Sequence, residues 1–363
     1  MNCYNKHIFL KGGDFVRTYF EIINDVLERV SGGETAITVP EGVVMLDEIT
    51  WDCPPIKSIK LPSSLRIIDS YAFEDCDSLK ELILPPNTVT IGNRAFIGCS
   101  GLEKITIPEK LTTIGEEAFC SCVSLKEIII PAACVLFGEK IFRDCRELSS
   151  IKVSPDNDLY DSRDNCNAVI RKHSNTLLAG CYNTVIPKSV NHIGQGAFYE
   201  CKKLSRVVLH SNIVTVGRDA FGGCSNLKSA YICQSVTEIG DRAFWNCPSL
   251  ETLVISDSVK KMGNDVFYMC PSLRKVHVKN VTGDKKAAEE IYRQTGISPE
   301  TTIKNAVADN DIDFIINYGN EYITNENVDY LIGISAEKKS TEVSAFLLKL
   351  KHTGFPSPDE DYL

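Results

Sequence analysis

The 363-residue sequence has few of the groups on which enzyme active sites are built. It contains neither a phosphate-binding G-x-x-x-x-G-K loop nor the G-x-S-x-G turn of serine hydrolases. Its six histidines are scattered along the chain: His7, His173, His192, His210, His277 and His352. We therefore predict that the protein is not an enzyme and has no catalytic residues, no cofactor and no small-molecule substrate.

Basic clusters and long apolar runs are also missing. Lys and Arg number 39 against 48 Asp and Glu, a net charge of −9, which argues against nucleic acid or an anionic membrane as a partner. The amino terminus lacks the apolar stretch of a signal peptide and no terminal anchor is seen, so we expect no membrane insertion. The 15 cysteines avoid disulfide-like spacings and favour a reducing cytoplasm, with a cell-surface or secreted location as the alternative.

What the sequence does contain is a cysteine repeated every 23 residues, interrupted once. A Phe stands three residues before each cysteine from the second onward, and a Leu stands three residues after it. A spacing held this closely indicates one supersecondary unit stacked many times. The nine cysteines are Cys53, Cys76, Cys99, Cys122, Cys145, Cys201, Cys224, Cys247 and Cys270.

Each unit is predicted to contain one short strand. Ile105 and Ile107 alternate with exposed residues, and Pro108 then ends the strand. A Gly such as Gly92 precedes the Phe and suits a tight turn with positive φ. Because a single unit cannot bury its own apolar face, neighbouring units stack, and the cysteines form a column of small buried thiols. Zinc prefers closely paired ligands such as C-x-x-C, so we predict no metal site.

The stretch Leu79-x-x-Leu82-x-Leu84-x-x-Asn87 fits the general leucine-rich repeat pattern, although later units lack the Asn. The repeated I-G-x-x-A-F-x-x-C-x-x-L frame with its terminal prolines resembles the BspA-type (Treponema-type) leucine-rich repeat family of bacterial and protozoan proteins. The resemblance covers residues 36–280. It implies a curved α/β solenoid, a horseshoe of parallel strands in 23-residue coils, which binds proteins or other macromolecules. Many family members are surface adhesins, and the resemblance implies no catalytic residues.

Between Cys145 and Cys201 the spacing grows to 56 residues. The extra segment, near residues 155–185, alternates in polarity and is predicted to form a hairpin of two or three strands. Cys166 and Cys181 lie on this hairpin, and their pairing as a disulfide is left open. The aspartates at positions 156, 158, 161 and 164 do not have EF-hand spacing, so we interpret them as solvated turn residues.

The two ends differ from the repeats. Residues 1–35 are predicted to form a helical cap, because apolar residues within 14–30 lie near helical spacing. Residues 281–363 hold 15 Asp and Glu against 8 Lys and Arg, a net charge of −7, and are predicted to be a small all-α region. Its expected helices cover 284–295, 309–319, 324–336 and 340–351. This region is interpreted either as a cap or as a separate interaction module.

Two columns of side chains are candidates for binding a partner. The first column points outward from the predicted sheet and is apolar or aromatic in five units, bordered by charged residues. Its members are Ile83, Ile129, Val208, Tyr231 and Val254. The second column follows the A-F pair and comprises Tyr199, Trp245 and Tyr268.

We therefore expect a protein–protein interaction scaffold whose partner, of unknown identity, binds the sheet face. The alternative function is a surface or exported adhesin that binds a host protein or glycan. For the outward column, the competing interpretation is structural, because β-branched residues favour strands whatever they contact.

Overall fold

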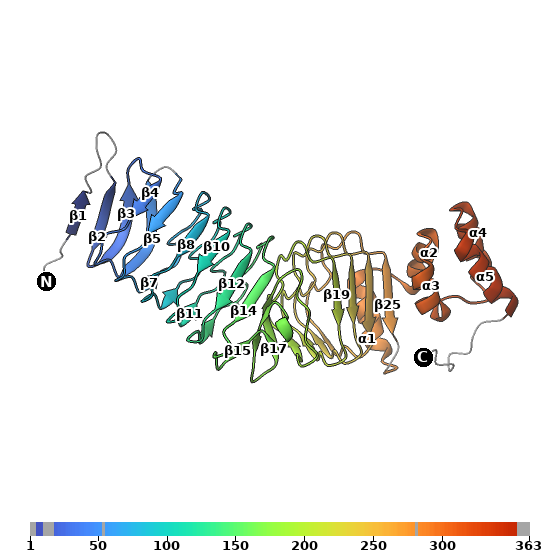
Figure 1. Cartoon of the computed structure of the whole chain (residues 1–363). Coiled ribbons are helices and arrows are strands. Elements are labelled where there is room, and N and C mark those ends of the chain that lie inside the picture. Colours follow the sequence, from blue (N-terminus) through green and yellow to red (C-terminus); the bar gives the residue numbers. More distant parts are fainter. Residues whose placement is uncertain (1–4, 10–17, 53–54, 280–281, 354–363) are drawn as a thin grey trace.

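The computed structural model describes residues 5–9, 18–52, 55–279 and 282–353. Its coils stack into one elongated solenoid, and helices gather beyond the last strand (Figure 1). The predicted solenoid of stacked coils with a small helical C-terminal region is confirmed. Cys3 and Cys53 lie outside the described residues.

One side of the solenoid carries the predicted strands, which we call the main sheet. Strands of successive coils pair in parallel with residues 23 positions apart opposite each other, as for Leu82 and Ile105. The hairpin segment separates two four-stranded groups. They are β8 (Glu81–Ile83), β10 (Lys104–Thr106), β12 (Glu127–Ile130) and β14 (Ser150–Val153), then β19 (Arg206–Leu209), β21 (Ser229–Ile232), β23 (Thr252–Ser256) and β25 (Lys275–Lys279). Before β8, the parallel pair β4 (Ala36–Thr38) and β6 (Ser58–Lys60) begins this side.

The opposite side of each coil carries a strand of only two residues. These strands also pair in parallel, so each coil is hydrogen-bonded to its neighbours on both sides. They are β7 (Ile67–Ile68), β9 (Thr90–Ile91), β11 (Thr113–Ile114), β13 (Leu136–Phe137), β18 (His192–Ile193), β20 (Thr215–Val216), β22 (Glu238–Ile239) and β24 (Lys261–Met262).

The phenylalanines of the repeat stack on one another through the core. Ring centroids of Phe73 and Phe96 are 5.1 Å apart, and those of Phe96 and Phe119 are 5.3 Å apart. A second run begins at Phe198, whose centroid is 5.1 Å from that of Phe221. Every filler is therefore shared by two coils, which is why single coils are not expected to be stable alone.

The cysteine column is buried in the same core and carries hydrogen bonds. The Cys99 thiol donates to the carbonyl of Phe73 in the preceding coil (3.0 Å), and the Cys224 thiol donates to that of Phe198 (3.2 Å). Burial raises the pKa of Cys224 to about 12. All thirteen described cysteines are free thiols. Cys120 lies outside this column but is buried as well, with only 3% of its residue exposed.

The repeated glycines are required by close contact between coils and not by positive φ, which corrects our expectation. A Cβ on Gly92 would lie 2.7 Å from the carbonyl carbon of Asp69 in the coil before it. The left-handed conformation falls two residues later, at Arg94 (φ 55°) and its equivalent Glu117 (φ 51°). These side chains form an ion pair of 2.7 Å across the stack.

The helical cap predicted for residues 1–35 is wrong in its described part. The segment forms antiparallel strands β1 (Asn5–Phe9), β2 (Tyr19–Ile23) and β3 (Val26–Ser31), and β3 then pairs in parallel with β5 (Met45–Asp52). Asn24 and Asp25 both have positive φ, which suits the two-residue turn of a hairpin. The meander extends the short-strand side and covers the first coil (Figure 1).

The predicted hairpin insertion is present. It comprises β15 (Tyr160–Asp161), the 3-10 turn η1 (Arg163–Asn165), β16 (Ala168–Arg171) and β17 (Thr176–Gly180), paired antiparallel. β17 then continues the solenoid by pairing in parallel with β18. Cys166 and Cys181 are both free, and the Cys181 thiol contacts Asn183 Oδ1 at 2.9 Å instead.

In the described part of the chain, five α-helices follow the last strand: α1 (Lys285–Thr295), α2 (Pro299–Ala308), α3 (Ile312–Tyr318), α4 (Val328–Glu337) and α5 (Thr341–Thr353), with the 3-10 turn η2 (Gly319–Glu321) after α3. Helix α2 was not predicted, although Ser298 caps it and Pro299 begins it. Ile291 of α1 packs into the solenoid core, whereas α2 to α5 form a small core of their own. Among the described residues, no helix is both long and apolar enough to cross a bilayer.

Removal of a stacked ring is expected to destabilise the solenoid. Phe119→Ala deletes a fully buried side chain shared by two coils and should cost about 3–5 kcal/mol in the free energy of unfolding. Leu136→Ala, on the exposed opposite side of the next coil, is the control and should have little effect. Denaturant unfolding measures both variants, and an unchanged midpoint for Phe119→Ala would contradict the shared core.

Thiol labelling tests the cysteine column. Cys99, Cys122 and Cys224 should resist a thiol reagent in the native protein, because they are fully buried. Cys270 is half-buried and its pKa is lowered by a hydrogen bond from the Cys247 thiol, so it should react first among the described cysteines. Mass spectrometry of timed samples reports the order. Rapid labelling of Cys99 before Cys270 is the outcome that excludes this account.

Candidate functional site

The outward positions of the main sheet line up in space because the strands are in register. Thr106 lies opposite Ile83, Ile129 opposite Lys152, and Val208 opposite Tyr231. We call these positions the outward column. It reads Lys60, Ile83, Thr106, Ile129 and Lys152 before the hairpin, and Val208, Tyr231, Val254 and His277 after it.

Before the hairpin the outward column is open to solvent. Ile83 is 74% exposed and Ile129 is 55% exposed. Lysines and glutamates border these side chains, and Lys126 pairs with Glu103 at 2.5 Å. After the hairpin Val208 is still 52% exposed, and Tyr231 is half-buried with the Arg206 guanidinium 4.7 Å from its ring centroid.

At the C-terminal end the column is covered by the protein itself. Val254 is only 9% exposed and His277 only 1%, so our expectation that Val254 faces solvent is wrong. Tyr322 OH lies 2.6 Å from His277 Nδ1, and the Tyr318 ring centroid lies 4.4 Å from that of His277. Helix α3 and the residues after it therefore lie on the sheet face above β25.

Ion pairs and backbone hydrogen bonds hold residues 299–322, which we call the tail, against β25. Lys275, buried at the start of β25, pairs with Asp311, and Arg274 pairs with Asp309 at 2.9 Å. The Thr302 hydroxyl of α2 accepts from the Val276 N–H (3.0 Å) and donates to the Val276 carbonyl (3.1 Å). Helix α2 thus occupies the open edge of β25, where unpaired backbone groups would otherwise promote aggregation.

His277 is a buried titratable group in this contact. Burial lowers its pKa to about 4, with the positive charge of Lys279 as a smaller cause. Glu321 Oε2 lies 3.9 Å from His277 Nδ1, but its negative charge does not outweigh the lowering of the His277 pKa by burial. The imidazole is therefore neutral at pH 7, and the tail is docked around an uncharged ring.

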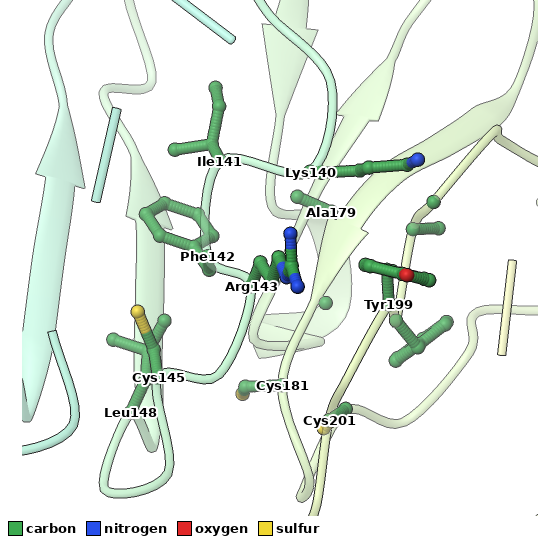
Figure 2. Close-up of a pocket in the computed structure, with 14 residues that line it drawn as sticks. Lys140, Ile141, Phe142, Arg143, Cys145, Leu148, Ala179, Cys181, Tyr199 and Cys201 are labelled. Carbon is green, nitrogen blue, oxygen red and sulfur yellow. The ribbon is translucent and has the colours of Figure 1, made fainter. Parts of the chain in front are cut away.

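The second predicted column does not form a continuous free surface. Figure 2 shows Tyr199 beside Lys140 and Arg143, whose charged groups lie 4.6 Å and 5.2 Å from its ring centroid. Tyr199 and Trp245 are half-buried, whereas Tyr268 is exposed. Tyr199 is thus held within a charged network, and its role as a binding anchor stays a prediction.

That network lies at the junction after the hairpin. The coil there is shortened, because β17 and β18 pair residues that are 16 positions apart instead of 23. The Gly180 N–H donates to the Ala197 carbonyl, as the N–H of a repeat Phe such as Phe198 donates to the Ala of the next coil, so Gly180 stands in the position of a repeat Phe. A Cβ on Gly180 would lie 2.3 Å from the Phe198 ring. Ion pairs of 3.0 Å from Lys140 to Asp219 and 2.8 Å from Arg143 to Glu200 bridge the neighbouring coils. The cavity beneath, shown in Figure 2, has about 10 Å³ of free space, room for about one water.

Within the described ranges, no group of three or more His, Cys, Asp or Glu side chains could hold a metal ion. Sequence reasoning identified Ile83, Ile129 and Val208 as outward residues. It did not anticipate the covering of the last strands by Phe314, Tyr318 and Tyr322. The acidic and aromatic composition of residues 309–322 was the available signal, but composition does not say which surface a segment will cover.

Comparison with known proteins identifies the repeats. The sequence profile described as "BspA type Leucine rich repeat region (6 copies)" matches residues 47–166 and 175–287. No curated protein matches the chain significantly.

Solved structures share the solenoid. The pneumococcal vaccine antigen PcpA is 19% identical with a TM-score of 0.56, and the match covers 76% of this chain and 83% of PcpA. A leucine-rich repeat protein from Bacteroides ovatus is 26% identical with a TM-score of 0.50, covering 75% of this chain and 71% of that one. A leucine rich cell surface protein from Faecalibacterium prausnitzii is 22% identical with a TM-score of 0.48, covering 78% and 97%.

The docked tail should make stability depend on pH. The folded-state pKa of His277 (about 4) lies below the ordinary value near 6.5, so below pH 6.5 the unfolded chain binds the proton more readily. The contribution of His277 to stability should thus be present above pH 6.5 and be lost as pH falls towards 4.

Denaturant unfolding of the wild type and His277→Gln between pH 7.5 and pH 4 measures this contribution. The variant should lose less stability over that interval, whatever its stability at pH 7.5. Identical pH profiles for the two proteins would show that His277 does not take part in the linkage.

Proposed function

Because the chain belongs to the BspA-type leucine-rich repeat family, we propose that it is a non-catalytic scaffold that binds a protein partner through the outward face of its main sheet. The proposal concerns the exposed part of the outward column. These residues are Ile83, Ile129 and Val208, with Tyr231 at the margin of the covered part.

The observation that carries this proposal is the docking of the chain's own tail. Val254 and His277 are both buried, and His277 is covered by Tyr322, which lies 45 residues further along the chain. The main sheet face can therefore hold a polypeptide against its outward side chains. The equivalent side chains before the hairpin are bare, and exposed apolar residues with a charged border are common in protein interfaces.

A second candidate function is that of a surface or exported adhesin that binds a host protein or glycan. The name of PcpA describes that pneumococcal protein as a vaccine antigen, which motivates the comparison. Fractionation of native cells distinguishes the two candidates. Recovery in the envelope or culture medium supports the adhesin, and recovery in the cytosol supports the scaffold.

The binding face can be tested with two substitutions around the same coil. Ile129→Asp places a charge in the outward column, and Leu136→Asp places one on the opposite side at similar exposure (55% and 61%). Ile129→Asp should reduce capture of a partner from native lysate at least ten-fold, because the contact would have to bury an unpaired charge. Leu136→Asp should capture as the wild type does.

Quantitative mass spectrometry of the captured proteins reports both variants, after thermal unfolding has shown that each is folded. Loss of the partner with Leu136→Asp and its retention with Ile129→Asp would move the interface to the short-strand side and refute the proposal.

A further inference from the structure

The segment that docks on the last strands has a distinct composition. Residues 309–322 read D-N-D-I-D-F-I-I-N-Y-G-N-E-Y, with four acidic residues, three aromatic residues and no Lys or Arg. Tyr318 and Tyr322 cover His277 of the outward column, while Asp309 and Asp311 reach the cations at the start of β25. Aromatic groups thus cover the column and acids pair with its basic border.

The basic border of β25 recurs before the hairpin at the same positions of the repeat. Lys275 is the first residue of its strand, as Lys104 is of β10. Arg274 stands one residue earlier, and that position is Lys80 before β8 and Lys126 before β12. Lys80, Lys104 and Lys126 are exposed, whereas Lys275 is buried by the tail.

The charge of the bare face differs from that of the whole chain. Five lysines and three glutamates surround Ile83, Thr106 and Ile129, although the chain has a net charge of −9. These are Lys60, Lys80, Lys104, Lys126 and Lys152, with Glu81, Glu103 and Glu127. The local excess of positive charge favours an acidic partner.

From these observations we infer that the bare N-terminal half of the main sheet, from β6 to β14, binds an acidic helical segment of a partner protein that carries aromatic side chains. The aromatic residues contact Ile83, Thr106 and Ile129, and the acids pair with Lys80, Lys104 and Lys126. Five strands at about 4.8 Å span about 19 Å, the length of a helix of about 13 residues. This inference rests on the proposed function and adds the chemistry of the partner.

The test uses the full-length protein and a labelled, end-blocked peptide of residues 309–322 as the probe. Fluorescence anisotropy measures its affinity. One comparison peptide has Asp309, Asp311 and Asp313 replaced by Lys, and a second has Phe314, Tyr318 and Tyr322 replaced by Ala. Each comparison peptide should bind at least ten-fold more weakly than the native sequence, and binding of the native peptide should weaken as salt is raised.

Protein variants locate the site. Ile83→Asp and Lys104→Glu should each weaken peptide binding at least ten-fold, and Lys261→Glu, on the opposite side, should leave it unchanged. Val208→Asp should also leave it unchanged, because that residue lies beyond the hairpin. Weakening by Val208→Asp or Tyr231→Asp alone would show that the peptide displaces the tail, which overturns the inference.

Other outcomes separate this inference from the proposed function. Equal binding of the acidic and lysine-substituted peptides, or no binding of any peptide, overturns the inference that this face binds an acidic helical segment. If Ile129→Asp still abolishes capture of a lysate partner, the scaffold function stands without it. A concentration-dependent dimer in analytical ultracentrifugation that Ile83→Asp abolishes would assign the face to a second copy and would equally overturn the inference.

Discussion

The structure depends on one constraint: a 23-residue coil cannot bury its apolar side chains unless another coil lies against it. The stacked phenylalanines, the thiol-to-carbonyl hydrogen bonds and the close approach at glycines such as Gly92 all connect one coil to the next. The same contacts fix the register of the strands. In consequence, outward side chains such as Ile83 and Ile129 fall on one line without any contact that holds them there.

A stack of this kind has two ends and, in this chain, one interruption, and each is closed differently. Antiparallel strands continue the sheet at the amino-terminal end. Ion pairs such as Lys140–Asp219 join the coils beside the shortened coil. At the other end, Thr302 of α2 satisfies the backbone of β25, and the chain then turns over the sheet face. Closure of the last coil has thus also produced an internal example of a polypeptide bound to that face.

Much of the solenoid could be predicted from the sequence because the same pattern of Gly, Phe, Cys and Leu positions recurs in successive coils. Each end of the solenoid occurs only once, so no recurring pattern supports the prediction of its structure. Apolar residues in 14–30 fit a helical period, but Phe20 and Ile22 also alternate as in a strand, and pairing with the first coil decides in favour of the strand. Cys120 occupies a position that varies between coils, yet packing between coils buries it.

The candidate site was only partly predictable for a related reason. Repeat register places Val254 and His277 on the outward face as reliably as Ile83. Whether such a residue is exposed depends on contacts with a segment distant in sequence, which periodicity cannot reveal. The buried, neutral His277 and its contact with Tyr322 follow from that tertiary contact alone.

Hydrogen–deuterium exchange of the full-length protein, alone and bound to its captured partner, tests the central claim most directly. The account predicts that the partner newly protects β8, β10 and β12, while β25 and the tail that covers it exchange as in the free protein. Protection confined to the short strands of the opposite side, or to α4 and α5, would contradict the claim that the main sheet face binds the partner.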